Sequence, residues 1–106
     1  EGDPVKWVRE LPAARESTEQ ETQAARSLFQ EGRAAYDVAD FERARDHWLR
    51  AYLTAPVPAS LLNLAACMKQ LKRLDEARAL YQRVVADPRA SEAVKERARS
   101  GLRELH

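Results

Sequence analysis

The sequence has little of what several classes of protein require. Its single cysteine, Cys67 in 106 residues, can form neither an internal disulfide nor a zinc cluster of cysteines. Only three glycines are present, and they are too scattered to build a phosphate-binding loop. No apolar run approaches the roughly 20 residues of a membrane-spanning helix. We therefore expect no integral membrane contact.

An excess of charge of one sign is also lacking. Lysine and arginine total 18 against 17 acids, a formal net charge of +1, which is far from the strongly basic character of a nucleic-acid-binding domain. Residues 59–106 carry ten bases against six acids, but the two signs are interleaved at helical spacing. That pattern is typical of a solvated, ion-paired surface and predicts no nucleic-acid partner.

Residues of the types that catalyse reactions are few and poorly spaced. The histidines, His47 and His106, stand at no spacing from serine, cysteine, aspartate or glutamate that indicates a triad or a zinc-binding helix. Cys67 lies in the apolar run 61–68, which favours a buried and unreactive thiol. We expect no enzyme activity, no metal and no cofactor.

Helix-forming sequence makes up most of the chain. From Ala24 onward alanine, leucine and arginine dominate, and apolar residues recur at helical spacing. No stretch alternates apolar and polar residues for long enough to predict a strand. The predicted fold class is a single all-α domain with about five main helices and a short N-terminal helix.

Residues 1–22 differ from the rest, with six acids against three bases. Asp3 as a cap and Pro4 at the first helical position predict a short helix that Pro12 ends. The apolar residues on or near one face of this helix are Val5, Trp7, Val8 and Leu11. A partly ordered tail is the alternative for this segment.

A longer helix is predicted to follow. Ser17 or Thr18 can cap it, and Glu21, three residues after Thr18, completes a capping box. Its apolar periodicity continues to about Val38.

Two stretches of the chain match each other at an offset of 33 residues. The matched pairs are Gly32 and Ala65, Phe41 and Leu74, Ala44 and Ala77, Trp48 and Tyr81, and Ala51 and Val84. Small residues at positions 32 and 44 would let two helix axes approach to about 8–10 Å, and the aromatic residue would fill the space between successive pairs. The match predicts two copies of one helix–turn–helix unit.

This pattern resembles the tetratricopeptide repeat, a 34-residue pair of antiparallel helices. Gly32 matches the small residue at the helix crossing and Trp48 the large packing residue, whereas Ala65 and Lys72 stand where the family often has glycine. The resemblance implies an α-solenoid. Its units would be an N-terminal extension at residues 1–22, repeats at 23–57 and 58–90, and a C-terminal capping helix at 91–106.

The ends of the later helices can be predicted from their polar caps and prolines. Asp40 and Asp75 are predicted to cap the second helix of each pair, and Pro56 and Pro88 to end it. Ser91 is predicted to cap the last helix. The apolar stripe of that helix consists of Val94, Ala98, Leu102 and Leu105. This helix either closes the stack with a polar outer side or begins a third repeat.

The resemblance implies a partner-binding groove lined by the first helix of each pair. The implied residues are Arg26, Phe29, Arg33, Tyr36 and Asp37 in the first unit, Ala59, Leu62, Asn63, Ala66, Lys69 and Gln70 in the second, and Lys95 and Arg99 in the last helix. Apolar residues ringed by bases would suit an acidic, partly hydrophobic segment of another protein. Arg33 is expected to lie deepest.

The resemblance does not extend to a complete clamp for a terminal carboxylate. Asn63 matches one residue of the clamp that some family members use, but the first-unit positions hold Phe29 and Arg33. Binding of a chaperone tail is therefore not expected.

The leading functional hypothesis is a non-catalytic scaffold or adaptor. The alternative is self-assembly through exposed repeat edges, because two repeats fall below the about three that a stable stack usually needs. A third hypothesis places residues 1–22 in the groove as an internal ligand. The alanine- and arginine-rich composition is of a bacterial type, and both the cytoplasm and the cell envelope stay open as locations. The sequence begins without methionine, which indicates trimming or processing.

Overall fold

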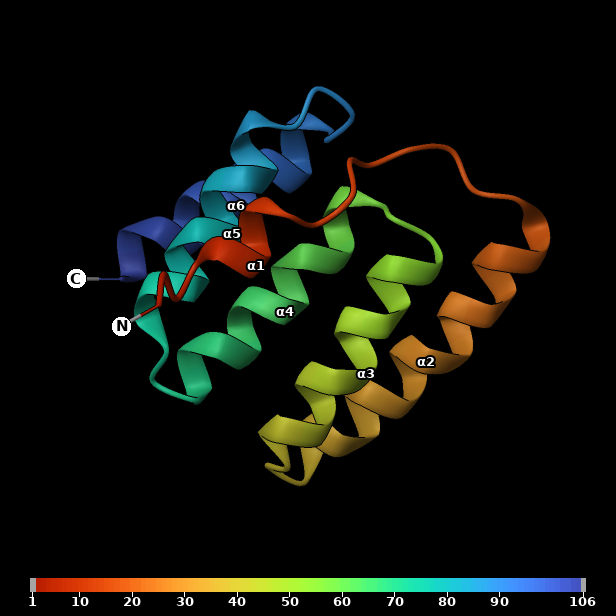
Figure 1. The fold of residues 1–106 in the computed structure, drawn as a ribbon, viewed down its shortest axis with the longest axis horizontal. Coiled ribbons are helices and arrows are strands. Elements are labelled where there is room, and N and C mark those ends of the chain that lie inside the picture. The colour runs from red at the N-terminus through yellow and green to blue at the C-terminus, as the bar shows by residue number, and fades with distance from the viewer. Residues whose placement is uncertain (1, 106) are drawn as a thin grey trace.

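The computed structural model describes residues 2–105, and within that range the chain forms six helices and no strand (Figure 1). The helices are α1 (Lys6–Arg9), α2 (Glu19–Asp37), α3 (Phe41–Thr54), α4 (Pro58–Gln70), α5 (Leu74–Ala86) and α6 (Glu92–Glu104). The predicted all-α class is confirmed. Because α2 begins at Glu19, it starts inside the segment 1–22 that was assigned to the N-terminal extension.

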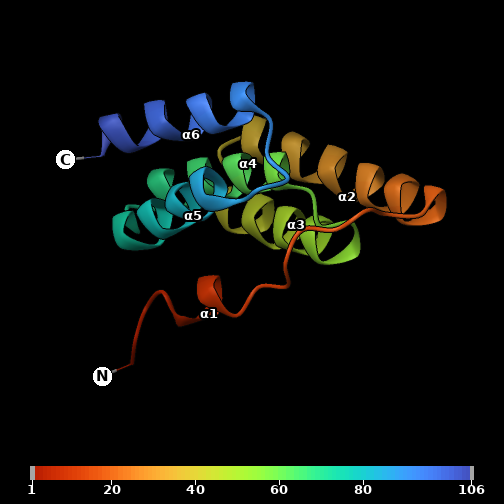
Figure 2. The ribbon, with the colours of Figure 1, turned by 90° about the horizontal axis from the view of Figure 1, so that it is seen from above.

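From α2 onward, each helix packs against the next one in the chain. We call α2–α3 the first helix pair and α4–α5 the second helix pair. The helix α6 packs on both α5 and α4, whereas α1 packs on α5. Figure 2 shows α1 and α6 on opposite sides of the molecule, with the two pairs between them.

Three of the predicted caps are present. The Thr18 hydroxyl accepts a hydrogen bond from Glu21 N, and the Glu21 carboxylate accepts one from Thr18 N at 2.9 Å, so the capping box is complete. Asp40 accepts from the third residue of α3, and Ser91 accepts from Val94 N at 3.2 Å. These side chains satisfy backbone donors that have no partner inside their helices.

Two predicted caps are wrong. The residue at the N-cap of α5 is Arg73, without a side-chain cap, and Asp75 lies in the first turn. Arg73 is the residue 33 positions after Asp40, so the repeat register gives the correct N-cap position. The prediction failed because it chose the nearest aspartate instead of this position. The helix α1 begins after Val5, and Asp3 accepts a hydrogen bond from Val5 N instead of capping at position 3.

The prolines end the helices as predicted. The helices α3 and α5 stop at Thr54 and Ala86, two residues before Pro56 and Pro88. Pro58 is the first residue of α4, where its missing N–H leaves no intrahelical bond unmade.

The core of the first helix pair is organised around Trp48, which is 2 % exposed. A Cβ atom at Gly32 would lie 2.5 Å from the indole ring, so only glycine allows the two helices to approach this closely. The indole Nε1 donates to the Phe29 carbonyl of α2 at 3.0 Å. A second close approach joins α5 to α6, where a Cβ atom at Gly101 would collide with the phenol ring of Tyr81.

The turns within the two pairs share an unusual backbone conformation. Ala39 and Lys72 have φ values of 64° and 63° and lie 33 residues apart. In each turn the amide of the following residue donates back to a carbonyl near the helix end, from Asp40 to Ala35 and from Arg73 to Met68. With the bonds from Ala39 N to the Tyr36 carbonyl and from Lys72 N to the Lys69 carbonyl, both helix ends are closed by the Schellman motif, whose left-handed residue is usually glycine.

Candidate functional site

An apolar cavity of about 450 Å³ opens between α2 and α4. Its floor comes from the end of α3, and Arg97 of α6 stands at its border. The residues that define its shape and chemistry are Arg26, Phe29, Ala55, Ala59, Asn63 and Arg97. We call this site the α2–α4 cavity.

The cavity exists because small side chains meet where three helices converge. Ala51 and Ala55 are buried in its floor, and Ala59 faces them from α4. One wall is formed by Phe29, whose ring packs against Trp48 with centroids 5.6 Å apart. A larger residue at any of the three alanines would fill the volume, so the hollow is set by the residue sizes.

The charges at the α2–α4 cavity are all positive. Arg26 and Arg97 are exposed, and neither has a carboxylate within 4.0 Å among residues 2–105. Among residues 2–105, no aspartate or glutamate lines the cavity. The arrangement combines an apolar hollow with two cations that are available to an oxygen acceptor.

Four of the groove residues expected from the sequence do lie together at the cavity. They are Arg26, Phe29, Ala59 and Asn63. Phe29, Asn63 and Arg97 follow one another at intervals of 34 residues and come from α2, α4 and α6. Extension of that spacing into the last helix would have identified Arg97, which the sequence analysis missed in favour of Lys95 and Arg99.

Arg33 does not lie deepest, and that expectation is wrong. Its side chain is 63 % exposed, is paired with Asp37 at 3.3 Å and takes no part in lining the α2–α4 cavity. Tyr36 lies on the same helix but packs against the rings of Phe41 and Trp48, at centroid distances of 5.0 and 5.4 Å. The cavity adjoins the N-terminal half of α2, whereas these residues belong to its C-terminal half.

The remaining expected residues lie outside the cavity lining, some of them in the core, some in ion pairs and some on the surface. Leu62 is only 6 % exposed and belongs to the core, so it offers little surface to a partner. Lys69 is hydrogen-bonded to Glu104 of α6 at 2.8 Å, and this contact raises the pKa of the lysine. Arg99 is paired with Glu96, Gln70 is exposed at the end of α4, and neither lines the cavity. The same is true of half-buried Lys95 and Ala66.

The N-terminal segment does not occupy this cavity. Trp7 donates to Glu76 of α5, and the carbonyl of Pro12 accepts from Tyr52 of α3. The hypothesis that residues 1–22 fold back into the groove is therefore wrong for the part of them that the structure describes. The apolar side chains of Val8 and Leu11 are instead buried on the surface formed by α3 and α5.

The other reactive side chains are occupied or inaccessible. Cys67 is fully buried, as predicted, and burial raises the pKa of its thiol to about 12, so the thiolate that would react is not populated at neutral pH. His47 is 2.9 Å from Glu31 through Nε2, and its Nδ1 is 3.0 Å from the Arg43 carbonyl. Between residues 2 and 105, no three metal-binding side chains of the His, Cys, Asp or Glu type come together.

Comparison with known proteins gave no match to a family model, a curated protein or a solved structure. None of the helices described is long and apolar enough to cross a membrane. The chemistry of the α2–α4 cavity therefore carries the functional inference.

Proposed function

We propose that this chain is a tetratricopeptide-type α-solenoid that acts as a non-catalytic scaffold or adaptor. It binds an acidic, partly apolar segment of a partner protein in the α2–α4 cavity. The supporting features are the 33-residue register of the two helix pairs and the placement of Phe29, Asn63 and Arg97 on every second helix (α2, α4 and α6) around one cavity. The observation that carries the proposal is an apolar cavity bordered by two arginines, neither of which forms an ion pair with a carboxylate of residues 2–105.

Each part of the cavity favours one part of the ligand. The alanine floor and the Phe29 ring accept an apolar side chain, whose burial contributes roughly 1.5–3 kcal/mol. Arg26 and Arg97 offer planar donor groups to a carboxylate, which a guanidinium can bind through two hydrogen bonds. The amide of Asn63 and the hydroxyl of Ser60 can bond to the ligand backbone. A short segment with a large apolar residue next to an aspartate or glutamate meets all three requirements.

The proposal can be tested with a library of random peptides displayed on phage. Peptides retained by the wild-type chain should be enriched in an acidic residue within one to three positions of a large apolar one. Arg97→Glu should reduce the affinity of a selected peptide at least tenfold, equal to about 1.4 kcal/mol, because it places a like charge beside the carboxylate.

A matched control is Arg50→Glu. Arg50 is exposed on α3, away from the cavity lining, and the substitution makes the same change of net charge. Peptide affinity should stay within about twofold of wild type in this variant, measured at one fixed salt concentration. If peptide affinity fell equally in the two variants, the change in net charge alone would explain the loss. The assignment of the peptide site to the α2–α4 cavity would then be overturned.

A further inference from the structure

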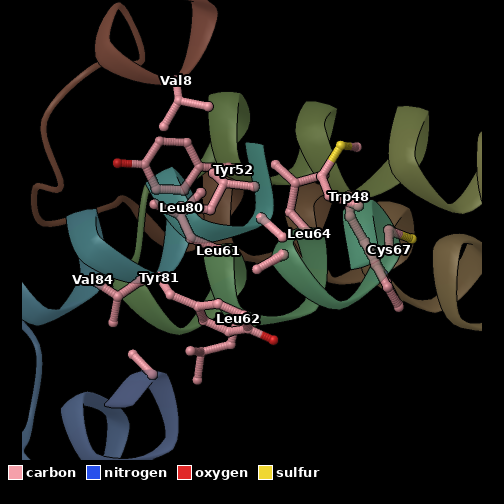
Figure 3. Close-up of a cluster of buried hydrophobic side chains, with 14 of the residues drawn as sticks. Val8, Trp48, Tyr52, Leu61, Leu62, Leu64, Cys67, Leu80, Tyr81 and Val84 are labelled. Atoms are coloured by element: carbon pink, nitrogen blue, oxygen red, sulfur yellow. The ribbon is translucent and has the colours of Figure 1, made fainter. Parts of the chain in front are cut away.

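A second candidate site lies on the surface formed by α3 and α5, and the N-terminal segment of the chain covers it. We call residues 5–12 the strap and the surface beneath them the seat. Val8 of the strap is 1 % exposed and Leu11 is 9 % exposed, although both belong to a segment with only one helical turn. Figure 3 shows Val8 above the ring of Tyr52, and Figure 2 shows the strap lying beside the two pairs.

The seat recognises the backbone of the strap through Arg83. One terminal nitrogen of its guanidinium donates to the Val8 carbonyl at 2.6 Å, and the other donates to the carbonyls of Leu11 and Pro12 at 2.8 and 2.7 Å. Tyr52 donates its hydroxyl to the same Pro12 carbonyl at 2.7 Å. One guanidinium can reach the carbonyls of Val8, Leu11 and Pro12 together only if the backbone turns between residues 8 and 12, so these donors favour a segment with such a turn.

The seat also recognises one side chain of the strap. The Trp7 indole donates to the carboxylate of Glu76 at 2.6 Å. Glu76 is only 6 % exposed, and its other partner is Arg73, at 2.7 Å. Removal of the strap would take from Glu76, Arg83 and Tyr52 the partners Trp7, Val8, Leu11 and Pro12 and expose these polar groups to water, so a segment of matching chemistry could bind to them again.

A short linker, residues 13–17, connects the strap to the rest of the chain. Residues 13–17 have no regular secondary structure and lead to α2, in the first helix pair, whereas α1 packs on α5 in the second. Arg15 holds this linker in two ways: its backbone N donates to the Pro56 carbonyl, between α3 and α4, at 3.1 Å, and its guanidinium pairs with Glu21 of α2 at 3.0 Å. None of the contacts in the seat requires that the strap belong to the same molecule.

We infer that the seat is a second peptide-binding site and that its ligand in trans is the strap of another copy of this chain. Exchange replaces each contact with an identical one, so the main costs are the entropy of association and the extension of the linker. The strap in cis competes at an effective concentration on the order of millimolar. Exchange is therefore favoured at high protein concentration, or when a copy lacks a functional strap. This differs from association through the edges of the stack.

A labelled synthetic peptide of residues 2–16 tests the seat directly. The full-length variant Leu11→Asp keeps its seat but cannot bury its own strap, so it should bind the peptide at least tenfold more tightly than wild type does. Addition of Arg83→Met to this variant should remove that binding. The milder peptide variant Trp7→Phe keeps an aromatic ring but lacks the indole donor to Glu76 and part of the ring area, and it should bind several-fold more weakly than the wild-type peptide.

Exchange between copies is tested by mixing two full-length variants in sedimentation experiments. Leu11→Asp supplies an intact seat, Arg83→Met supplies an intact strap, and their mixture should form a heterodimer at concentrations where each variant alone is a monomer. Circular dichroism of each variant confirms that it is folded. If the peptide binds wild type and Leu11→Asp equally, or the mixture stays monomeric, the inference is overturned.

Discussion

The two candidate sites of this molecule, the seat and the α2–α4 cavity, differ in what occupies them. On the α3–α5 surface, the guanidinium of Arg83 meets three carbonyl oxygens, and the apolar space is taken by Val8 and Leu11. At the α2–α4 cavity, Arg26 and Arg97 meet no carboxylate among the described residues, and the apolar space is open. In the seat, the chain places hydrogen-bond acceptors on Arg83 and apolar side chains next to it. The open site has the same components without the ligand.

The largest expected effect would abolish both sites together. Trp48 packs between α2 and α3 and supports Phe29 in the cavity wall. Trp48→Ala should cost about 3–5 kcal/mol, a large share of the roughly 5–15 kcal/mol that stabilises a small domain. Denaturant unfolding followed by circular dichroism measures it, with Leu53→Ala, at a half-exposed position, as the control. An unchanged unfolding midpoint in Trp48→Ala would contradict the packing described.

The next effect separates the filled site from the open one. Arg83→Met removes three charge-assisted hydrogen bonds and should lower the free energy of unfolding by about 2–3 kcal/mol. It should also speed tryptic cleavage at Arg9 and Arg15, because the strap is released. Arg89→Met is the matched control, since the Arg89 side chain is exposed and only its backbone N–H is hydrogen-bonded. Equal cleavage rates in the two variants would show that Arg83 does not hold the strap.

A smaller effect depends on pH and concerns the start of α2, beside the linker. A hydrogen bond from Arg15 and a second from the Thr18 backbone lower the pKa of Glu21 from 4.5 to about 2. The pKa is lower in the folded state than in the unfolded state, so this contribution to stability is present above about pH 4.5 and is lost as the pH falls toward 2. Glu21→Gln should flatten the decline of the melting temperature over this range. A decline identical to that of wild type would contradict the assignment.

The smallest effect on stability is expected at the open site. Arg97 has no ion pair within residues 2–105, so Arg97→Ala should change the free energy of unfolding by no more than about 0.5 kcal/mol. The same denaturant measurement that detects Arg83→Met would detect a larger change. A loss comparable to that of Arg83→Met would mean that Arg97 serves the fold, and the contrast between the two sites would disappear.

Local rules accounted for much of the fold. The capping box of Thr18 and the cap at Ser91 depend on residues within three positions of each other, and the repeat register identified Gly32 and Trp48 as packing residues, although it did not indicate that they contact each other. The path of the strap could not be predicted in this way. Its position depends on Arg83, more than 70 residues away in sequence, and helical periodicity does not indicate which carbonyls a distant guanidinium will meet.

The candidate site was predictable only in part. Register placed Arg26, Phe29 and Asn63 at one surface, because equivalent helices present equivalent faces. The hollow itself depends on the convergence of Ala51 and Ala55 with α4, which is a property of the packed helices. The preference for Arg33 failed because an aspartate one turn later on the same helix already pairs with it.

The left-handed turns at Ala39 and Lys72 have a practical consequence. A residue with a side chain costs about 1–2 kcal/mol in this backbone conformation, whereas glycine adopts it freely but loses more entropy on folding. Replacing Ala39 and Lys72 by glycine should therefore raise the free energy of unfolding by roughly 1 kcal/mol. Neither position belongs to the lining of the α2–α4 cavity or to the contacts of the seat. In this more stable background, destabilising substitutions in the strap or the cavity would be less able to unfold the protein. Their effects on binding could then be compared between folded proteins at a single temperature.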